Sequence, residues 1–116
     1  MLLSLYPRPS LDVLMPDPKF CGRLLEPIKI AAMAEGAGLL ASPHGPASPA
    51  GTAAAAQVCA TLPNVPILEF SQGEVPWRGE RIDPPEQIVD SALPLSERPG
   101  SGIAIKDRTA KKYAVS

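Results

Sequence analysis

The sequence predicts an α/β fold, part of a (β/α)8 barrel, from two observations. Short apolar runs alternate with helix-like segments in the order strand, helix, strand, helix, strand. Each apolar run ends at an ionisable residue, and these residues are Asp17, His44 and Glu69. Their regular spacing places one reactive group at the same end of every strand, where barrel enzymes build their active sites. A whole barrel takes about 250 residues, so 116 residues can supply only part of one.

The first predicted elements are a strand over residues 11–15 and a helix over about 24–36. Apolar side chains recur near helical spacing through the second segment, with Glu and Lys between them. Gly36 and Gly38 predict the end of this helix, because glycine readily adopts the backbone conformation of a helix C-cap.

The next predicted elements are a strand over 39–41, a helix over 50–62 and a third strand over 65–70. Ser48 and Pro49 predict the start of the second helix, since serine is a favourable N-cap and proline suits the first helical position. The strands are almost continuously apolar, which is typical of a parallel sheet covered on both faces.

The character of the chain changes after Ser71. Glycine, proline and charged residues replace hydrophobic periodicity through about residue 100. A short strand is predicted within 102–105, and a short helix or an ordered tail within 107–113.

Composition excludes several classes of function. A net charge of −1 provides no broad basic face, so we expect no nucleic-acid partner. No apolar run approaches a membrane span, and no signal-peptide pattern is present, so we expect a cytoplasmic protein without a membrane partner. Cys21 and Cys59 show no metal-binding spacing and are expected to be reduced, although they could in principle pair.

Asp17 and His44 end consecutive strands of the predicted sheet. Neighbouring parallel strands lie about 5 Å apart, so the carboxylate can bond the imidazole and fix its tautomer. A histidine held in this way can take or give a proton near neutral pH. Glu69, one strand further on, could direct its carboxyl group into the same space and, if protonated, donate a hydrogen bond to a developing oxyanion.

Each of these residues also has a structural interpretation. An aspartate after a proline is often a turn former or helix N-cap. His44 could be an ordinary loop residue, and Glu69 could be solvated at a strand end. Spacing alone leaves both interpretations open.

Longer stretches of the chain resemble a known family. Residues 13–46, VLMPDPKFCGRLLEPIKIAAMAEGAGLLASPHGP, resemble the late barrel strands of the enolase superfamily. The likeness is to the mandelate racemase/muconate lactonizing enzyme branch, and within it to the galactonate dehydratase-like acid-sugar dehydratases. GTAAAAQVCATLPNVPILEF, residues 51–70, resembles the next helix and the eighth strand, and PGSGI, residues 99–103, resembles the return to the capping domain.

The resemblance implies a role for each strand-end residue. Asp17 would orient His44, His44 would move the proton, and Glu69 would bind the substrate carboxylate and stabilise the enediolate. The family removes a proton α to a carboxylate with Mg²⁺ bound, and either racemises a sugar acid or dehydrates it. Arg23 and Gly45 depart from the family pattern, which usually has a glycine and often an asparagine there.

The resemblance also implies the domain organisation. Residues 1–10 are an atypical N-terminal segment, 11–98 would form the last three β/α units of the barrel, and 99–116 would pack on the capping domain. The family's magnesium ligands lie on earlier strands, so we expect none of them in this chain.

Three interpretations follow from this organisation. The chain could be the C-terminal portion of an acid-sugar dehydratase, inactive alone. It could be half of a split enzyme completed by another polypeptide. It could also be a non-catalytic interaction protein that self-associates to cover its open strands.

Overall fold

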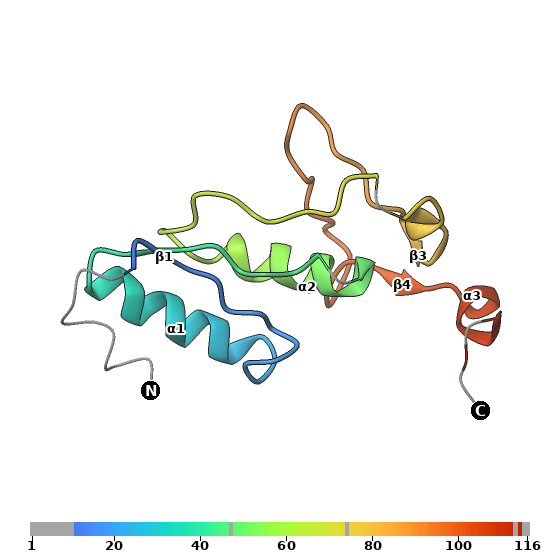
Figure 1. Ribbon diagram of the computed structural model, residues 1–116. Coiled ribbons are helices and arrows are strands. Elements are labelled where there is room, and N and C mark those ends of the chain that lie inside the picture. Colours follow the sequence, from blue (N-terminus) through green and yellow to red (C-terminus); the bar gives the residue numbers. More distant parts are fainter. Residues whose placement is uncertain (1–10, 47, 74, 113, 115–116) are drawn as a thin grey trace.

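The computed structural model describes residues 11–46, 48–73, 75–112 and 114 (Figure 1). The N-terminal segment 1–10 and the last residue of the predicted C-terminal helix, Tyr113, lie outside the described residues. In chain order the elements are β1 (Val13–Leu14), α1 (Leu25–Gly36), β2 (Leu40–Ala41), α2 (Pro49–Cys59), the 3-10 turn η2 (Arg78–Glu80), β3 (Ile82–Asp83), β4 (Ala104–Ile105) and α3 (Asp107–Lys112).

β1 and β2 pair in parallel, as the sequence predicts. The backbone amides of Leu40, Ser42 and His44 donate, in that order, to the carbonyls of Asp12, Leu14 and Pro16, at 2.8–3.1 Å. The pairing therefore continues past the short strands themselves. It ends with the His44 amide on the carbonyl of Pro16, which brings His44 beside Asp17.

The third predicted strand, residues 65–70, is wrong in one respect. The segment lies beside β2, because the Ala41 amide of β2 donates to the carbonyl of Asn64, just before the segment, at 3.0 Å. However, no strand is formed from 65 to 70. The third β/α unit therefore lacks a regular strand, and the next elements of the chain are η2 and β3.

Two prolines explain the missing ladder. In a parallel ladder that starts at Ala41, the next amides to donate would belong to Pro66 and Pro43, and proline has no N–H. A side chain makes a hydrogen bond between the two segments instead: the Ser42 hydroxyl donates to the Ile67 carbonyl at 2.7 Å.

Helix α1 occupies the predicted range and packs on β2. Ala31 and Ala34 are completely buried on this side of the helix. Gly38, just beyond the helix, has a φ of +72°, a left-handed conformation that glycine adopts without strain. The predicted glycine end of the helix is therefore confirmed.

Helix α2 begins as the sequence predicts. The Ser48 hydroxyl accepts a hydrogen bond from the Gly51 amide at 3.0 Å, and Pro49 occupies the first turn. Thr52, Ala55 and other small residues of the helix are buried, so its backbone lies close to the rest of the fold.

The C-terminal part adds a second small sheet. β3 pairs antiparallel with β4, so residues 82–83 lie beside 104–105. β4 and α3 both fall within the ranges predicted for a short strand and a short helix. In Figure 1, α3 lies at the opposite end of the molecule from α1.

One face of the β1–β2 sheet is apolar and uncovered. Leu14 and Ala41 point to the buried face, whereas Val13 and Leu40 are 38% and 42% exposed. The radius of gyration is 15.6 Å, compared with about 13 Å for a compact chain of this length. No helix among the described residues has the length and apolar character needed to cross a bilayer.

Candidate active site

Asp17 forms a turn and faces His44 at the same time. Its Oδ1 accepts the Lys19 amide at 2.7 Å, and its backbone carbonyl accepts the amides of Phe20 and Cys21. These bonds fix the carboxylate at the end of β1 and leave Oδ2 for another partner. The structural and functional interpretations of Asp17 are therefore compatible.

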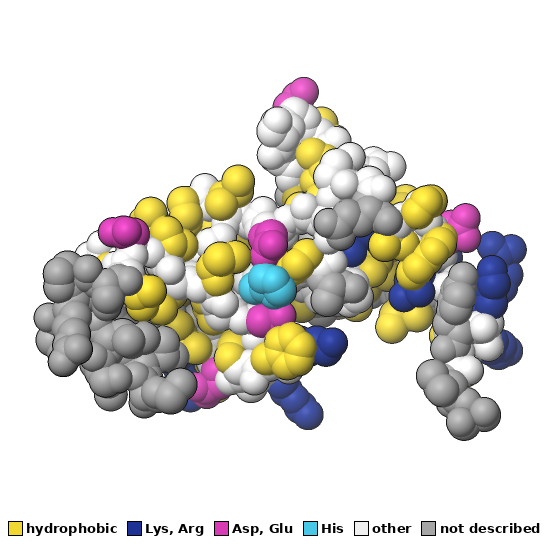
Figure 2. All heavy atoms as spheres, in the orientation of Figure 1, with side chains coloured by type: hydrophobic (Ala, Val, Ile, Leu, Met, Phe, Trp, Pro, Cys, Tyr) yellow, Lys and Arg dark blue, Asp and Glu magenta, His cyan; other side chains and the backbone are white. Residues whose placement is uncertain are grey.

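His44 lies between two carboxylates (Figure 2). Its Nδ1 lies 2.8 Å from Asp17 Oδ2, in hydrogen-bond geometry. The Asp17 side chain is only 12% exposed, whereas the His44 ring is 39% exposed. The Asp17 edge of the ring is therefore enclosed, and part of the ring remains accessible from solvent.

The second carboxylate contact is looser. Glu69 Oε2 lies 3.3 Å from His44 Nε2, but this oxygen is buried and has no hydrogen-bond partner. An ionised carboxylate and an unprotonated ring nitrogen would face each other with lone pairs. The contact is therefore a close approach of the two groups and not a formed hydrogen bond.

Burial alone would raise the pKa of the Asp17 carboxyl group. The hydrogen bonds from His44 and the Lys19 amide, with the positive charge of these residues, outweigh burial and lower this pKa below the ordinary value of 3.8. Asp17 is therefore ionised at neutral pH and can hold a proton on Nδ1 of His44.

The lowered pKa gives a first prediction, for Asp17→Asn. A depressed pKa stabilises the folded state above the unfolded-state pKa, and this contribution disappears as the pH falls through the folded-state pKa. We expect the variant to lose about 1–2 kcal/mol of unfolding free energy at pH 7, and the difference from wild type to shrink as the pH falls below 3.8. Urea unfolding at a series of pH values measures it.

Asp12→Asn is the control, since Asp12 is an exposed carboxylate just before β1. The free energy of unfolding of Asp12→Asn should stay close to that of wild type throughout the pH series. A difference for Asp17→Asn that does not change between pH 7 and pH 3 would contradict the assignment of charge to Asp17.

Sequence reasoning did not identify the residues that support the His44 loop. Thr52 and Arg78 are both buried and hydrogen-bond to this loop. Arg78 lies in an irregular segment without periodicity, so no sequence signal connects it to His44. The neighbouring Trp77 is 40% exposed and stacks on the Arg81 guanidinium.

Close packing explains why a glycine, Gly45, stands at one of the positions that depart from the family pattern. A Cβ atom at this position would lie 2.9 Å from the Cβ of Ala55, a distance that forces a shift. The loop after His44 thus lies directly on α2. Arg23, the other departure, has a φ of +69°, so it retains a backbone conformation that favours glycine.

The described residues do not form a metal site. Among them, no group of three His, Cys, Asp or Glu side chains is arranged to hold a metal ion. Asp17 is already bonded to His44 and to the Lys19 amide. These described side chains therefore do not fit a magnesium ion.

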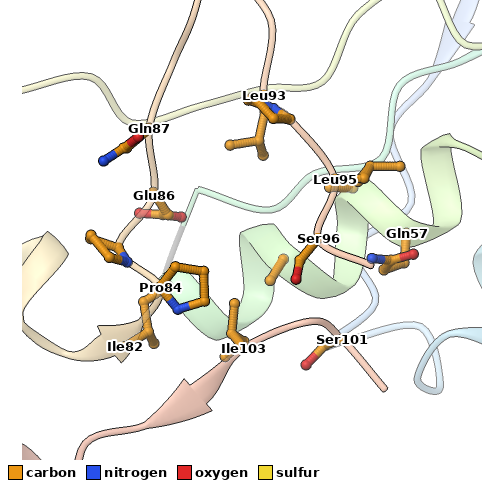
Figure 3. Close-up of a pocket in the computed structure, with 14 residues that line it drawn as sticks. Gln57, Ile82, Pro84, Glu86, Gln87, Leu93, Leu95, Ser96, Ser101 and Ile103 are labelled. Carbon is orange, nitrogen blue, oxygen red and sulfur yellow. The ribbon is translucent and has the colours of Figure 1, made fainter. Parts of the chain in front are cut away.

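A pocket of about 280 Å³ lies apart from these groups, between α2 and the segments around β3 and residues 93–103 (Figure 3). Gln57, Ile82 and Glu86 are among its lining residues. None of the three strand-end residues lines it, so the pocket is not part of the candidate site.

Comparison with known proteins decides the family. Residues 2–109 match the family model described as enolase C-terminal domain-like. The chain belongs to this family. The enolase C-terminal domain is the barrel part of enolase-superfamily proteins, so the prediction of a partial (β/α)8 barrel is confirmed.

Individual relatives agree with this membership. The chain is 30% identical to a D-xylonate dehydratase of Haloferax volcanii over 83% of its own length and 23% of that protein. It is 30% identical to a D-gluconate dehydratase of Thermoproteus tenax over 88% of its length and 21% of that protein. The crystal structure of a mandelate racemase/muconate lactonizing enzyme-like protein from Rubrobacter xylanophilus superposes with a TM-score of 0.85 at 31% identity, over 97% of this chain and 29% of that one.

The enolase-like chain spans less than a quarter of the length of these two curated relatives. Its described residues nevertheless include a histidine, His44, flanked by the carboxylates of Asp17 and Glu69.

Proposed function

We propose that this enolase-like chain provides the proton-transfer side of an acid-sugar dehydratase active site. The observation that carries the proposal is His44, held by Asp17 at 2.8 Å and facing Glu69 at 3.3 Å. The matched relatives named D-xylonate and D-gluconate dehydratase support a sugar-acid substrate.

In this proposal each atom of the site has its own task. Asp17 accepts a hydrogen bond from Nδ1 of His44, which fixes the tautomer and stabilises the protonated ring. Nε2 of His44 is then the atom that exchanges a proton with the substrate. Glu69, beside this nitrogen, binds the substrate carboxylate, and in its protonated form it donates to the oxyanion that develops there.

Magnesium belongs to the proposal only at the level of the whole protein. It would stabilise negative charge on the substrate when bound, but no described residue is assigned to hold it. We also propose that residues 11–98 belong to the barrel and that 99–116 pack on a capping domain. A cytoplasmic location remains a prediction from the sequence.

A second proposal concerns assembly. The apolar face that includes Val13 and Leu40 is uncovered by the described residues, and a parallel sheet is normally covered on both faces. The earlier strands of a barrel would cover it, whether they belong to the same polypeptide or to a partner chain. A stable, cooperatively unfolding monomer of the 116-residue chain would instead favour the non-catalytic interpretation.

The proposal predicts that the 116-residue chain alone does not dehydrate sugar acids. Among its described residues no group of side chains is arranged to hold a metal ion, so the enediolate lacks stabilisation by a metal and forms too slowly. The test incubates the chain with magnesium and a panel of aldonic and aldaric acids and measures the keto acid product. Turnover well above blank would show that the metal-binding half is not required.

A chimera tests the roles of the residues in a complete barrel. Residues 11–112 replace the matched segment of the Haloferax volcanii D-xylonate dehydratase, which supplies the remaining strands. We expect magnesium-dependent dehydration by the chimera. A folded chimera without turnover would count against the proposed function.

A further inference from the structure

The ladder between β2 and residues 65–70 is interrupted by prolines, yet His44 and Glu69 face each other across this gap. Some other set of bonds must therefore fix how the two residues are placed. The residues just after His44 show which bonds these are.

Both carbonyls that follow His44 are held by buried donors. The Thr52 hydroxyl donates to the Gly45 carbonyl at 2.8 Å, and the Arg78 guanidinium donates to the Pro46 carbonyl at 2.8 Å. Arg78 also donates to the Thr52 hydroxyl at 2.6 Å. One guanidinium therefore controls both contacts.

The Pro46 carbonyl also accepts a hydrogen bond from the segment that contains Glu69. The Ser71 hydroxyl, two residues after Glu69, donates to the Pro46 carbonyl at 3.1 Å. The Arg78 guanidinium lies 5.4 Å from the centre of the Phe70 ring. Arg78 thus contacts the residue that follows Glu69 as well as the loop that follows His44.

Glu86 fixes the guanidinium itself. Its two carboxylate oxygens accept from Nε and Nη2 of Arg78 at 2.6 and 3.1 Å, and both side chains are largely buried. Figure 3 shows Glu86 in the wall of the pocket beside α2. A two-point contact of this kind sets the direction of the guanidinium, which a single-point contact cannot do.

We propose that Arg78 is a positioning residue that sets the placement of His44 relative to Glu69. The inference rests on the proposed function for its catalytic meaning, but the placement itself can be measured without turnover. Lysine cannot replace arginine here, because one ammonium group cannot reach Pro46, Thr52 and both oxygens of Glu86 in the same geometry.

The chain contains one histidine, which makes His44 a clean spectroscopic probe. The test uses the 116-residue chain with ¹⁵N-labelled histidine and records the ring-nitrogen shifts at neutral pH. The change in these shifts on Glu69→Gln measures the contact between the two residues. We expect a clear change in the wild-type background and loss of most of it in the Arg78→Lys background.

Arg98→Lys is the matched control, because Arg98 forms the exposed ion pair with Asp83. It should leave the effect of Glu69→Gln intact. A folded Arg78→Lys variant with a lowered unfolding midpoint and an unchanged effect of Glu69→Gln would overturn the proposal, since Arg78 would then act on stability alone.

A second pair of variants covers the case in which Arg78→Lys does not fold. Thr52→Val removes the hydroxyl between Arg78 and Gly45, whereas Thr52→Ser retains it. We expect only the valine variant to lose the effect of Glu69→Gln. Equal effects in the two variants, or unfolding of both Arg78→Lys and Thr52→Val, would overturn the proposal, because the network would then be a requirement of the fold.

Discussion

Replacing His44 with asparagine should lower kcat of the chimera by about 10²- to 10⁴-fold, the usual contribution of general acid–base catalysis. Asparagine retains a polar group near the position of Nδ1, which faces Asp17, but it has no titratable nitrogen at the position of Nε2 to exchange a proton with the substrate. KM should change less than kcat, because the proton is transferred in the transition state and not on binding. Steady-state dehydration of D-xylonate measures both constants.

Lys29→Gln serves as the control for this experiment. Lys29 is exposed on α1 and pairs only with Glu26 among the interactions that the structure describes for it. It should leave kcat close to that of the chimera. A His44→Asn chimera with the same kcat as the control would exclude His44 as the proton-transfer group.

Replacing Glu86 with alanine should destabilise the folded chain by about 3–5 kcal/mol, because it leaves Arg78 as an unpaired buried charge. Domains are stabilised by only about 5–15 kcal/mol in total, so the variant should unfold at much lower urea concentration. Glu86→Gln should cost less, since its side-chain oxygen can still accept a hydrogen bond from Arg78. Urea unfolding followed by far-UV circular dichroism measures the three proteins.

Asp83→Ala is the matched control for the buried pair. Asp83 also pairs with an arginine, Arg98, but both side chains are more than half exposed. Its unfolding midpoint should stay close to that of wild type. If Glu86→Ala unfolds at the same urea concentration as Asp83→Ala, then the buried pair contributes no more than a surface pair.

The two main helices were predictable from the sequence because their signals are local. Ser48 and Pro49 mark the start of α2 through contacts within one helical turn. Gly38 marks the end of α1 through its own backbone conformation. Such signals do not depend on what the rest of the chain does.

The third strand was mispredicted because an apolar run does not reveal its hydrogen bonds. Residues 65–70 have the composition of a buried strand. Proline has no N–H to donate. However, Pro43 and Pro66 are recognised as consecutive positions of one ladder only when the register between residues 65–70 and β2 is known. That register is a property of the tertiary structure.

The sequence by itself determined the parallel β–α–β order. Its spacing also predicted that Asp17, His44 and Glu69 lie together at one end of the repeated unit, although residues 65–70 before Glu69 form no strand. Their catalytic roles stay a prediction until the variants are measured. Only the tertiary structure decided that Asp17 contacts Nδ1 of His44, that Glu69 faces the other ring nitrogen, and that Arg78 supports the loop between them. Directions of side chains and partners many residues apart depend on packing, which no local pattern encodes.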